Sequence, residues 1–135
     1  MSADTIEYLV NFIEQRIQGV LGINIVWYGG EPLLAIDLIE VISTRVLEIC
    51  RKNNVSFKAD MVTNGYLLTD ENVRKLIECE VKTIQVTLDG DREVHDSRRF
   101  LDEKKGSFDG ILSNLRNNAT REPKCSECKI LPKTI

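Results

Sequence analysis

The sequence has no apolar run that approaches the ~20 consecutive residues of a membrane-spanning helix, so we expect no membrane partner. It also lacks a long basic run, and its net charge of −3 argues against a nucleic-acid-binding surface. No signal peptide is recognisable, because Met1 leads directly into a capped amphipathic pattern. The sequence has four cysteines, and without secretion their thiols should stay reduced rather than form disulfides. We therefore expect a cytoplasmic protein.

An alternation of helical and strand patterns fills most of the chain. Its 135 residues are 42% hydrophobic and 29% charged, as is typical of one globular domain with a core. Apolar residues recur at helical spacing over about residues 4–21, 33–51, 69–77 and 107–115. Runs rich in β-branched residues predict strands at 23–28, 56–63 and 81–88. The links between these strands are too long for hairpins, which predicts parallel strands with right-handed crossovers.

Each predicted strand ends in a turn of glycine and polar residues. These turns are Gly29-Gly30-Glu31, Thr63-Asn64-Gly65 and Thr87-Leu88-Asp89-Gly90. In a parallel sheet the three ends lie on one edge, where α/β folds bind their ligands. Two glycines would expose bare backbone to a ligand, and Glu31 would add a carboxylate. The alternative is a set of ordinary strand-to-helix turns, because a Gly-Gly turn alone is a weak signal.

Four stretches together resemble the radical S-adenosylmethionine (SAM) superfamily, most closely its anaerobic sulfatase-maturase and peptide-modifying branch. They are residues 27–34 (WYGGEPLL), 62–68 (VTNGYLL), 86–90 (VTLDG) and 95–99 (HDSRR). Their order and spacing match over residues 1–117, and the combination is specific although each motif alone is not. The resemblance implies an α/β fold: a partial (β/α) barrel with a three-stranded parallel sheet and helices on its outer face.

The same resemblance implies a SAM site. The Gly-Gly-Glu-Pro turn would meet the amino group of SAM, because a carboxylate and backbone carbonyls are what an ammonium needs. Thr87 and Arg99 match the residues that meet the SAM carboxylate, for which a guanidinium fork is suited. The remaining turn residues would line the same cleft. The full set implied is Gly29, Gly30, Glu31, Pro32, Thr63, Asn64, Thr87, Asp89 and Arg99.

The family's cluster motif is absent from this sequence. Radical SAM enzymes hold a [4Fe–4S] cluster with three cysteines spaced CxxxCxxC, whereas the cysteines here are Cys50, Cys79, Cys125 and Cys128. By comparison with the family, the first strand with its cluster loop and the later barrel strands are missing. We therefore expect no cluster in this chain alone, and no delivery of the electron that cleaves SAM. Cys50 and Cys79 are predicted to be small core residues.

Residues 118–135 lack periodicity and are predicted to form an irregular tail, which resembles the start of the family's auxiliary-cluster (SPASM) segment. Cys125 and Cys128 have the spacing of metal ligands, but two thiolates are half of a four-cysteine site. A metal there would require a second chain or an adventitious ion, and both readings stay open. His95, the only histidine, is predicted to be a hydrogen-bonding or helix-start residue rather than a catalytic base.

The leading hypothesis is a truncated radical SAM domain of Fe–S oxidoreductase lineage, inactive alone and retaining part of a weak SAM site. One alternative is a non-catalytic oligomerising module that shares a metal at Cys125 and Cys128. Another is one part of a split enzyme whose cluster segment comes from a separate polypeptide. We also expect a homo-oligomer, because three strands leave both sheet edges and one sheet face uncovered.

Overall fold

The computed structural model describes residues 1–99, 105–119 and 129–134, in which helices and strands alternate as predicted. The four predicted helices and the three predicted strands are all present. In chain order the elements are α1 (Ala3–Arg16), β1 (Gly22–Trp27), the short 3-10 helix η1 (Pro32–Ala35), α2 (Ile36–Lys52), β2 (Ser56–Thr63), α3 (Asp70–Glu78), β3 (Val81–Leu88), α4 (Arg92–Arg98), α5 (Phe108–Ala119) and β4 (Lys129–Thr134).

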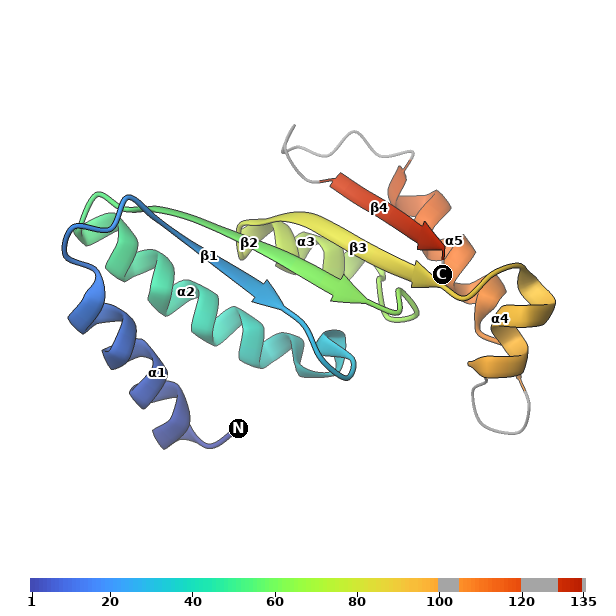
Figure 1. The fold of residues 1–135 in the computed structure, drawn as a ribbon, viewed down its shortest axis with the longest axis horizontal. Coiled ribbons are helices and arrows are strands. Elements are labelled where there is room, and N and C mark those ends of the chain that lie inside the picture. The colour runs from blue at the N-terminus through green and yellow to red at the C-terminus, as the bar shows by residue number, and fades with distance from the viewer. Residues whose placement is uncertain (100–104, 120–128, 135) are drawn as a thin grey trace.

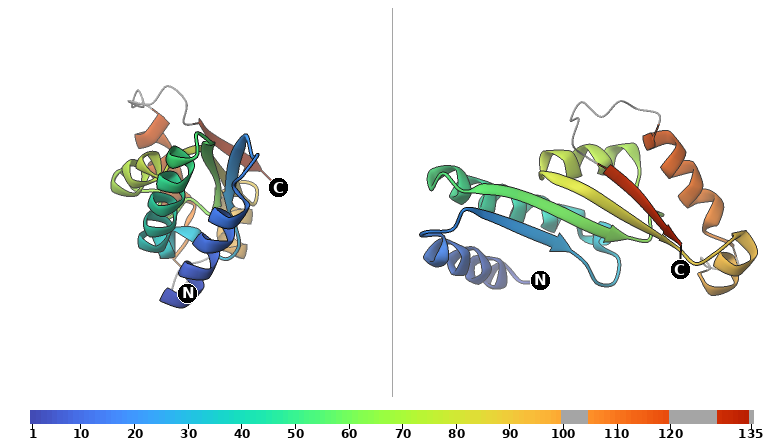
Figure 2. Two further views of the ribbon diagram at one scale, coloured as in Figure 1. Left: turned by 90° about the vertical axis from the view of Figure 1, so that its left-hand side faces the viewer. Right: turned by 45° about the horizontal axis from the view of Figure 1, so that its top comes forward.

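The strands form one sheet in which every pair is parallel, as predicted. Their spatial order is β1-β2-β3-β4, so each strand lies beside its neighbour in sequence. Helices α1, α2 and α3 lie along one face of the sheet (Figure 1). The view along the sheet shows no described helix on the opposite face (Figure 2). The carboxyl ends of β1, β2 and β3 consequently share one edge, and the turns that follow them are brought together there.

Strand β4 is a departure from the predicted irregular tail. It pairs with β3 from Thr83, opposite Lys129, to Leu88, opposite Thr134. The sequence gives little sign of it, because Pro132 lacks a backbone N–H and argues against a strand. A proline is tolerated on an edge strand, where one side of the backbone has no partner strand, and β4 lies at the edge of the sheet. The sheet therefore has one strand more than the three predicted.

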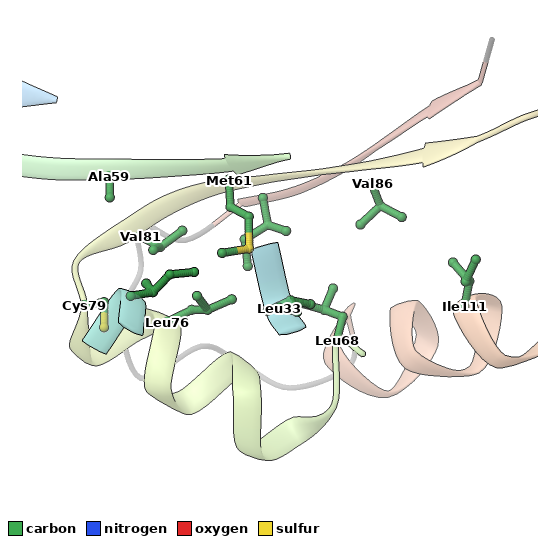
Figure 3. Packing of buried hydrophobic residues seen from close by; sticks show 11 residues of the cluster. Leu33, Ala59, Met61, Leu68, Leu76, Cys79, Val81, Val86 and Ile111 are labelled. Carbon is green, nitrogen blue, oxygen red and sulfur yellow. The ribbon is translucent and has the colours of Figure 1, made fainter. Parts of the chain in front are cut away.

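The core lies between the sheet and its helices. Met61 and Val86 point from β2 and β3 toward Leu76 of α3 and Ile111 of α5, and all four side chains are at most 1% exposed (Figure 3). A second cluster joins α1, α2 and β1 around Val46. Cys50 and Cys79 are free thiols buried at the ends of α2 and α3, which confirms their predicted place in the core. Burial raises the pKa of both thiols, so they remain neutral packing groups.

The opposite face of the sheet carries polar side chains at its centre. Asn24 of β1 donates a 3.0 Å hydrogen bond to the carboxylate of Asp60 on β2. Among the side chains of the sheet whose exposure the structure describes, Val26 of β1 is 55% exposed, and Tyr28 in the turn after β1 is 78% exposed. Of the described strands, β1 therefore shows the apolar exposure that the expectation of a homo-oligomer assumed.

Helix α4 is an element that the sequence analysis missed, in the polar stretch of residues 91–106. Asp91 caps it by accepting a 3.0 Å hydrogen bond from the backbone N–H of Val94. Most of its seven residues are polar, so it has no apolar stripe, and the Asp91 cap was the only available signal. The helix lies beyond the carboxyl end of β3 and carries Arg98 at its end, next to Arg99 (Figure 1).

Candidate functional site

The Glu31 carboxylate ties together the turns that follow β1 and β2. One of its oxygens accepts hydrogen bonds from the Thr63 hydroxyl at 2.7 Å and from the backbone N–H of Leu33 at 3.1 Å. The other accepts a 2.8 Å bond from the backbone N–H of Asn64. Glu31 is thus also the N-cap of η1. The structure uses this carboxylate internally, and a ligand at this turn would meet backbone groups as well as the remaining lone pairs of Glu31.

The Thr63-Asn64-Gly65 turn is fixed by its own hydrogen bonds. Thr63 is 3% exposed, and besides donating to Glu31 its hydroxyl accepts from the backbone N–H of Gly65 at 3.1 Å. The Asn64 side-chain oxygen accepts from the N–H of Tyr66 at 2.8 Å. Gly65 has φ +79°, and a Cβ there would come within 2.6 Å of a Val86 methyl group. Glycine is therefore required at this position for both conformation and packing.

The two glycines after β1 have a different reason to be glycine. Gly29 and Gly30 have φ values of +99° and +53°, and nothing lies within 4 Å of the place where a Cβ would stand. Backbone conformation, not crowding, selects glycine here. The space above this backbone is open, which is what close approach of a ligand would need. Pro32 follows at the start of η1.

The turn after β3 is closed by an ion pair. Arg99 donates from Nε to one oxygen of the Asp89 carboxylate at 2.6 Å and from an Nη atom to the other at 3.3 Å. This bidentate pair lowers the pKa of Asp89, first through the hydrogen bond and then through the positive charge. The Asp89 side chain is 13% exposed and that of Arg99 is 39% exposed, so the guanidinium is the member that faces outward.

A cavity of about 350 Å³ lies at this edge of the sheet. Three of the predicted site residues line it: Glu31, Asn64 and Arg99. The other described residues of the lining were not predicted from the sequence as site residues: Leu34, Tyr66, Leu67, Ser107 and Ile111. Tyr66 and Leu67 directly follow the Asn64 turn and could have been included on that ground. Ser107 and Ile111 come from the start of α5, and no local pattern connects them to the turns.

The other predicted site residues are not in the lining of this cavity. The turn beside Glu31 is formed by Gly29, Gly30 and Pro32. Thr63 hydrogen-bonds to Glu31, and Asp89 forms the ion pair with Arg99. Thr87 is half-buried near the end of β3. Thus the structure brings the predicted residues to one sheet edge and separates those that face the cavity from those that support them.

The predicted metal ligands Cys125 and Cys128 lie outside the described residues. Within the described ranges, no group of three or more histidine, cysteine, aspartate or glutamate side chains could hold a metal ion. Among the helices that the structure describes, none combines the length and apolar character needed to cross a membrane.

Most of the chain matches a known protein family. Residues 2–121 match the family model of the Radical SAM superfamily. Fe-coproporphyrin III synthase of Methanosarcina barkeri is 36% identical over 93 residues, which cover 69% of this chain and 21% of that enzyme. The cysteine-type anaerobic sulfatase-maturating enzyme of Clostridium novyi is 32% identical over 89 residues, covering 65% of this chain and 23% of the enzyme. The chain therefore spans about a fifth of the length of these relatives.

Solved structures agree with the sequence relatives. The native structure of anSMEcpe with bound AdoMet, which is SAM, superposes with a TM-score of 0.73 at 19% identity over 98% of this chain and 34% of that one. The structure of anSMEcpe with bound AdoMet and Cp18Cys peptide gives 0.73 at 20% identity, with the same coverage. At this identity the likeness concerns the fold, and it confirms the predicted partial barrel: the neighbours are radical SAM barrels of which this chain covers part.

Proposed function

Since the chain belongs to the radical SAM superfamily, we propose that its described residues carry part of a SAM-binding site at the carboxyl edge of the sheet. The family uses SAM together with a [4Fe–4S] cluster, and both neighbouring structures described above contain bound AdoMet. The observation that carries the proposal is the convergence of Glu31, Asn64 and Arg99 on one cavity from three separate turns.

The residues present suit the amino-acid part of SAM. The open backbone at Gly29 and Gly30 offers carbonyl oxygens, which an ammonium group needs as acceptors. Arg99 presents a guanidinium that Asp89 already orients, and such a fork matches a carboxylate. Thr87 adds one hydroxyl donor at the end of β3. In this proposal Glu31 faces the cavity and offers its remaining lone pairs to the ammonium group, while Thr63 contributes by holding the Glu31 carboxylate.

The cysteines that the structure describes do not fit an iron–sulfur cluster. Cys50 and Cys79 are buried in the core, where burial raises the pKa of each thiol, whereas cluster ligands are thiolates. We therefore propose that cleavage of SAM requires a cluster supplied by a segment outside these 135 residues, in the same polypeptide or in another. Taken by themselves, these residues would be an inactive Fe–S oxidoreductase-like domain with weak affinity for SAM.

Calorimetric titration with SAM tests the binding proposal, with Arg99→Ala as the variant. Loss of a charge-assisted hydrogen bond of about 1.5–3 kcal/mol should weaken binding by at least 10-fold. Arg98→Ala is the matched control, because Arg98 is an exposed neighbour on the same segment and lies outside the cavity lining. Circular dichroism checks that each variant folds. Absence of binding at millimolar SAM, or equal effects of the two substitutions, would contradict the proposal.

We also propose self-association along β1 as a second, non-catalytic role. The observation that favours it is the exposure of Val26 and Tyr28 beside the β1 edge of the sheet. A second copy, or a separate polypeptide, could pair with the backbone of this strand and cover these side chains. Light scattering at micromolar concentration tests self-association, and Val26→Lys should dissociate the oligomer. A monomer across that concentration range would contradict it.

A further inference from the structure

The ring of His95, the only histidine in the sequence, is completely buried and has a partner at each nitrogen. Its Nδ1 accepts a 3.2 Å hydrogen bond from the backbone N–H of Asp89. Its Nε2 lies 3.0 Å from the hydroxyl oxygen of Ser107. That hydroxyl donates its single hydrogen to the backbone carbonyl of Arg99 at 2.8 Å. It must therefore accept from Nε2, which assigns the neutral tautomer with the proton on Nε2.

These hydrogen bonds, together with the Arg99–Asp89 ion pair, form a closed loop. The Asp89 backbone bonds to the His95 ring, the ring to Ser107, and Ser107 to the Arg99 backbone, while the Arg99 side chain returns to the Asp89 carboxylate. This loop of hydrogen bonds joins the end of β3, the residue after α4 and the start of α5 to one another. The aromatic ring of Phe108 lies edge-on to that of His95, with 5.7 Å between centroids. Arg99 is thus held at two points: the Asp89 carboxylate binds its guanidinium, and the Ser107 hydroxyl binds its backbone carbonyl.

We propose that His95 is a positioning residue that holds Arg99 against the cavity, acting through Ser107 as a neutral Nε2–H imidazole. The inference rests on the proposed SAM site, because Arg99 is the group expected to receive the SAM carboxylate. A buried histidine that only filled space would not need a defined tautomer, nor a hydroxyl relay to the Arg99 carbonyl. Both directions of hydrogen bonding are fixed here, since a backbone N–H only donates and a carbonyl only accepts.

The tautomer can be read directly by nitrogen-15 NMR of histidine-labelled protein, because the chain contains a single histidine. The expected spectrum shows a protonated Nε2 and an unprotonated Nδ1, without averaging between them. A proton on Nδ1, or rapid exchange between the two tautomers, would overturn the assignment and the proposal with it. This readout requires no ligand.

The route through Arg99 is tested by a double-mutant cycle for SAM affinity. Ser107→Ala should weaken binding about 3- to 10-fold, the equivalent of one neutral hydrogen bond. In an Arg99→Ala background the same substitution should change affinity by less than about 2-fold, because its effect passes through Arg99. An unchanged effect of Ser107→Ala in that background would mean that Ser107 touches the ligand or acts elsewhere, and would refute the positioning role.

Matched controls separate positioning from general stability. Ser97→Ala also removes a serine hydroxyl that donates to a backbone carbonyl, that of Val94 at 2.8 Å, but on the exposed side of α4. It should leave SAM affinity unchanged, and Ser107→Thr should restore most of the affinity that Ser107→Ala loses.

If the unsubstituted chain binds no SAM, the proposed function fails, and the positioning role is then judged on exchange of the Arg99 Nε proton. That proton should exchange slowly in the unsubstituted protein and in Ser97→Ala, and faster in Ser107→Ala. Equal exchange in all three proteins would reject the role of His95 and Ser107.

Discussion

Replacing Glu31 should show how much one carboxylate contributes to stability by holding the turns after β1 and β2 together. Glu31→Ala removes the acceptor for the Thr63 hydroxyl and for the backbone N–H groups of Asn64 and Leu33. Hydrogen bonds to a charged group contribute about 1.5–3 kcal/mol each, but water can reach some of the freed donors because this turn is only half-buried. Thr63 is the exception, since its hydroxyl is buried with the residue at 3% exposure. We therefore expect a loss of about 2–4 kcal/mol rather than the full sum.

Urea unfolding followed by circular dichroism measures this loss. The stability of Glu31→Gln should lie between those of Glu31→Ala and the unsubstituted protein. Its amide keeps one acceptor oxygen, but its NH₂ group replaces the other oxygen and faces a donor that has then lost its acceptor. Glu14→Ala is the control, since Glu14 is exposed on α1 and its replacement should change stability by less than about 0.5 kcal/mol. A Glu31→Ala variant within about 1 kcal/mol of the unsubstituted protein would refute the view that this carboxylate fastens the two turns.

Three further outcomes follow from the same edge of the sheet and from the core. Gly65→Ala should destabilise by at least about 2 kcal/mol in urea unfolding, because φ is +79° and the added methyl group meets Val86 at 2.6 Å. The lowered pKa of Asp89 stabilises the fold at pH values above its ordinary 3.8, and this stabilisation is lost as pH falls through the lower folded value. Asp89→Asn should therefore be less stable at neutral pH and show a shallower loss of stability below pH 3.8. Peptide mapping should find Cys79 unreactive toward a maleimide until urea is added, because its thiol is buried and burial raises its pKa.

Helices, strands and their parallel order were predictable because each depends on local spacing. The helix predicted from residue 69, for example, begins after Thr69, whose hydroxyl caps α3 by accepting from the N–H of Asn72 at 3.3 Å. The meeting of three turns on one edge followed from parallel pairing alone. Helix α4 and β4 were missed because one has no apolar stripe and the other contains Pro132.

The internal partners of the site were less accessible to sequence reasoning. Glu31 was read as a ligand-facing carboxylate, yet its bonds go to Thr63 and Asn64, which are 32 and 33 positions away in sequence. Ser107 reaches His95 across 12 positions, again without a repeating pattern. Such pairs depend on how two turns approach one another, and that approach is set by the packing of the sheet on its helices rather than by either turn.

The strand order β1-β2-β3-β4 makes the sheet resemble a short linear array, in which contacts link each unit mainly to the next. In such an array stability is approximately a sum of unit and nearest-neighbour terms, and opening proceeds inward from the ends. Amide protons of β2 and β3 should consequently be the slowest to exchange and those of β1 among the fastest in the sheet. Addition or loss of one strand with its helix at an outer edge would leave the central register unchanged. The Thr63 and Asp89 turns follow these two central strands and so belong to the part of the array that opens last, whereas the Glu31 turn follows β1 and would open earlier.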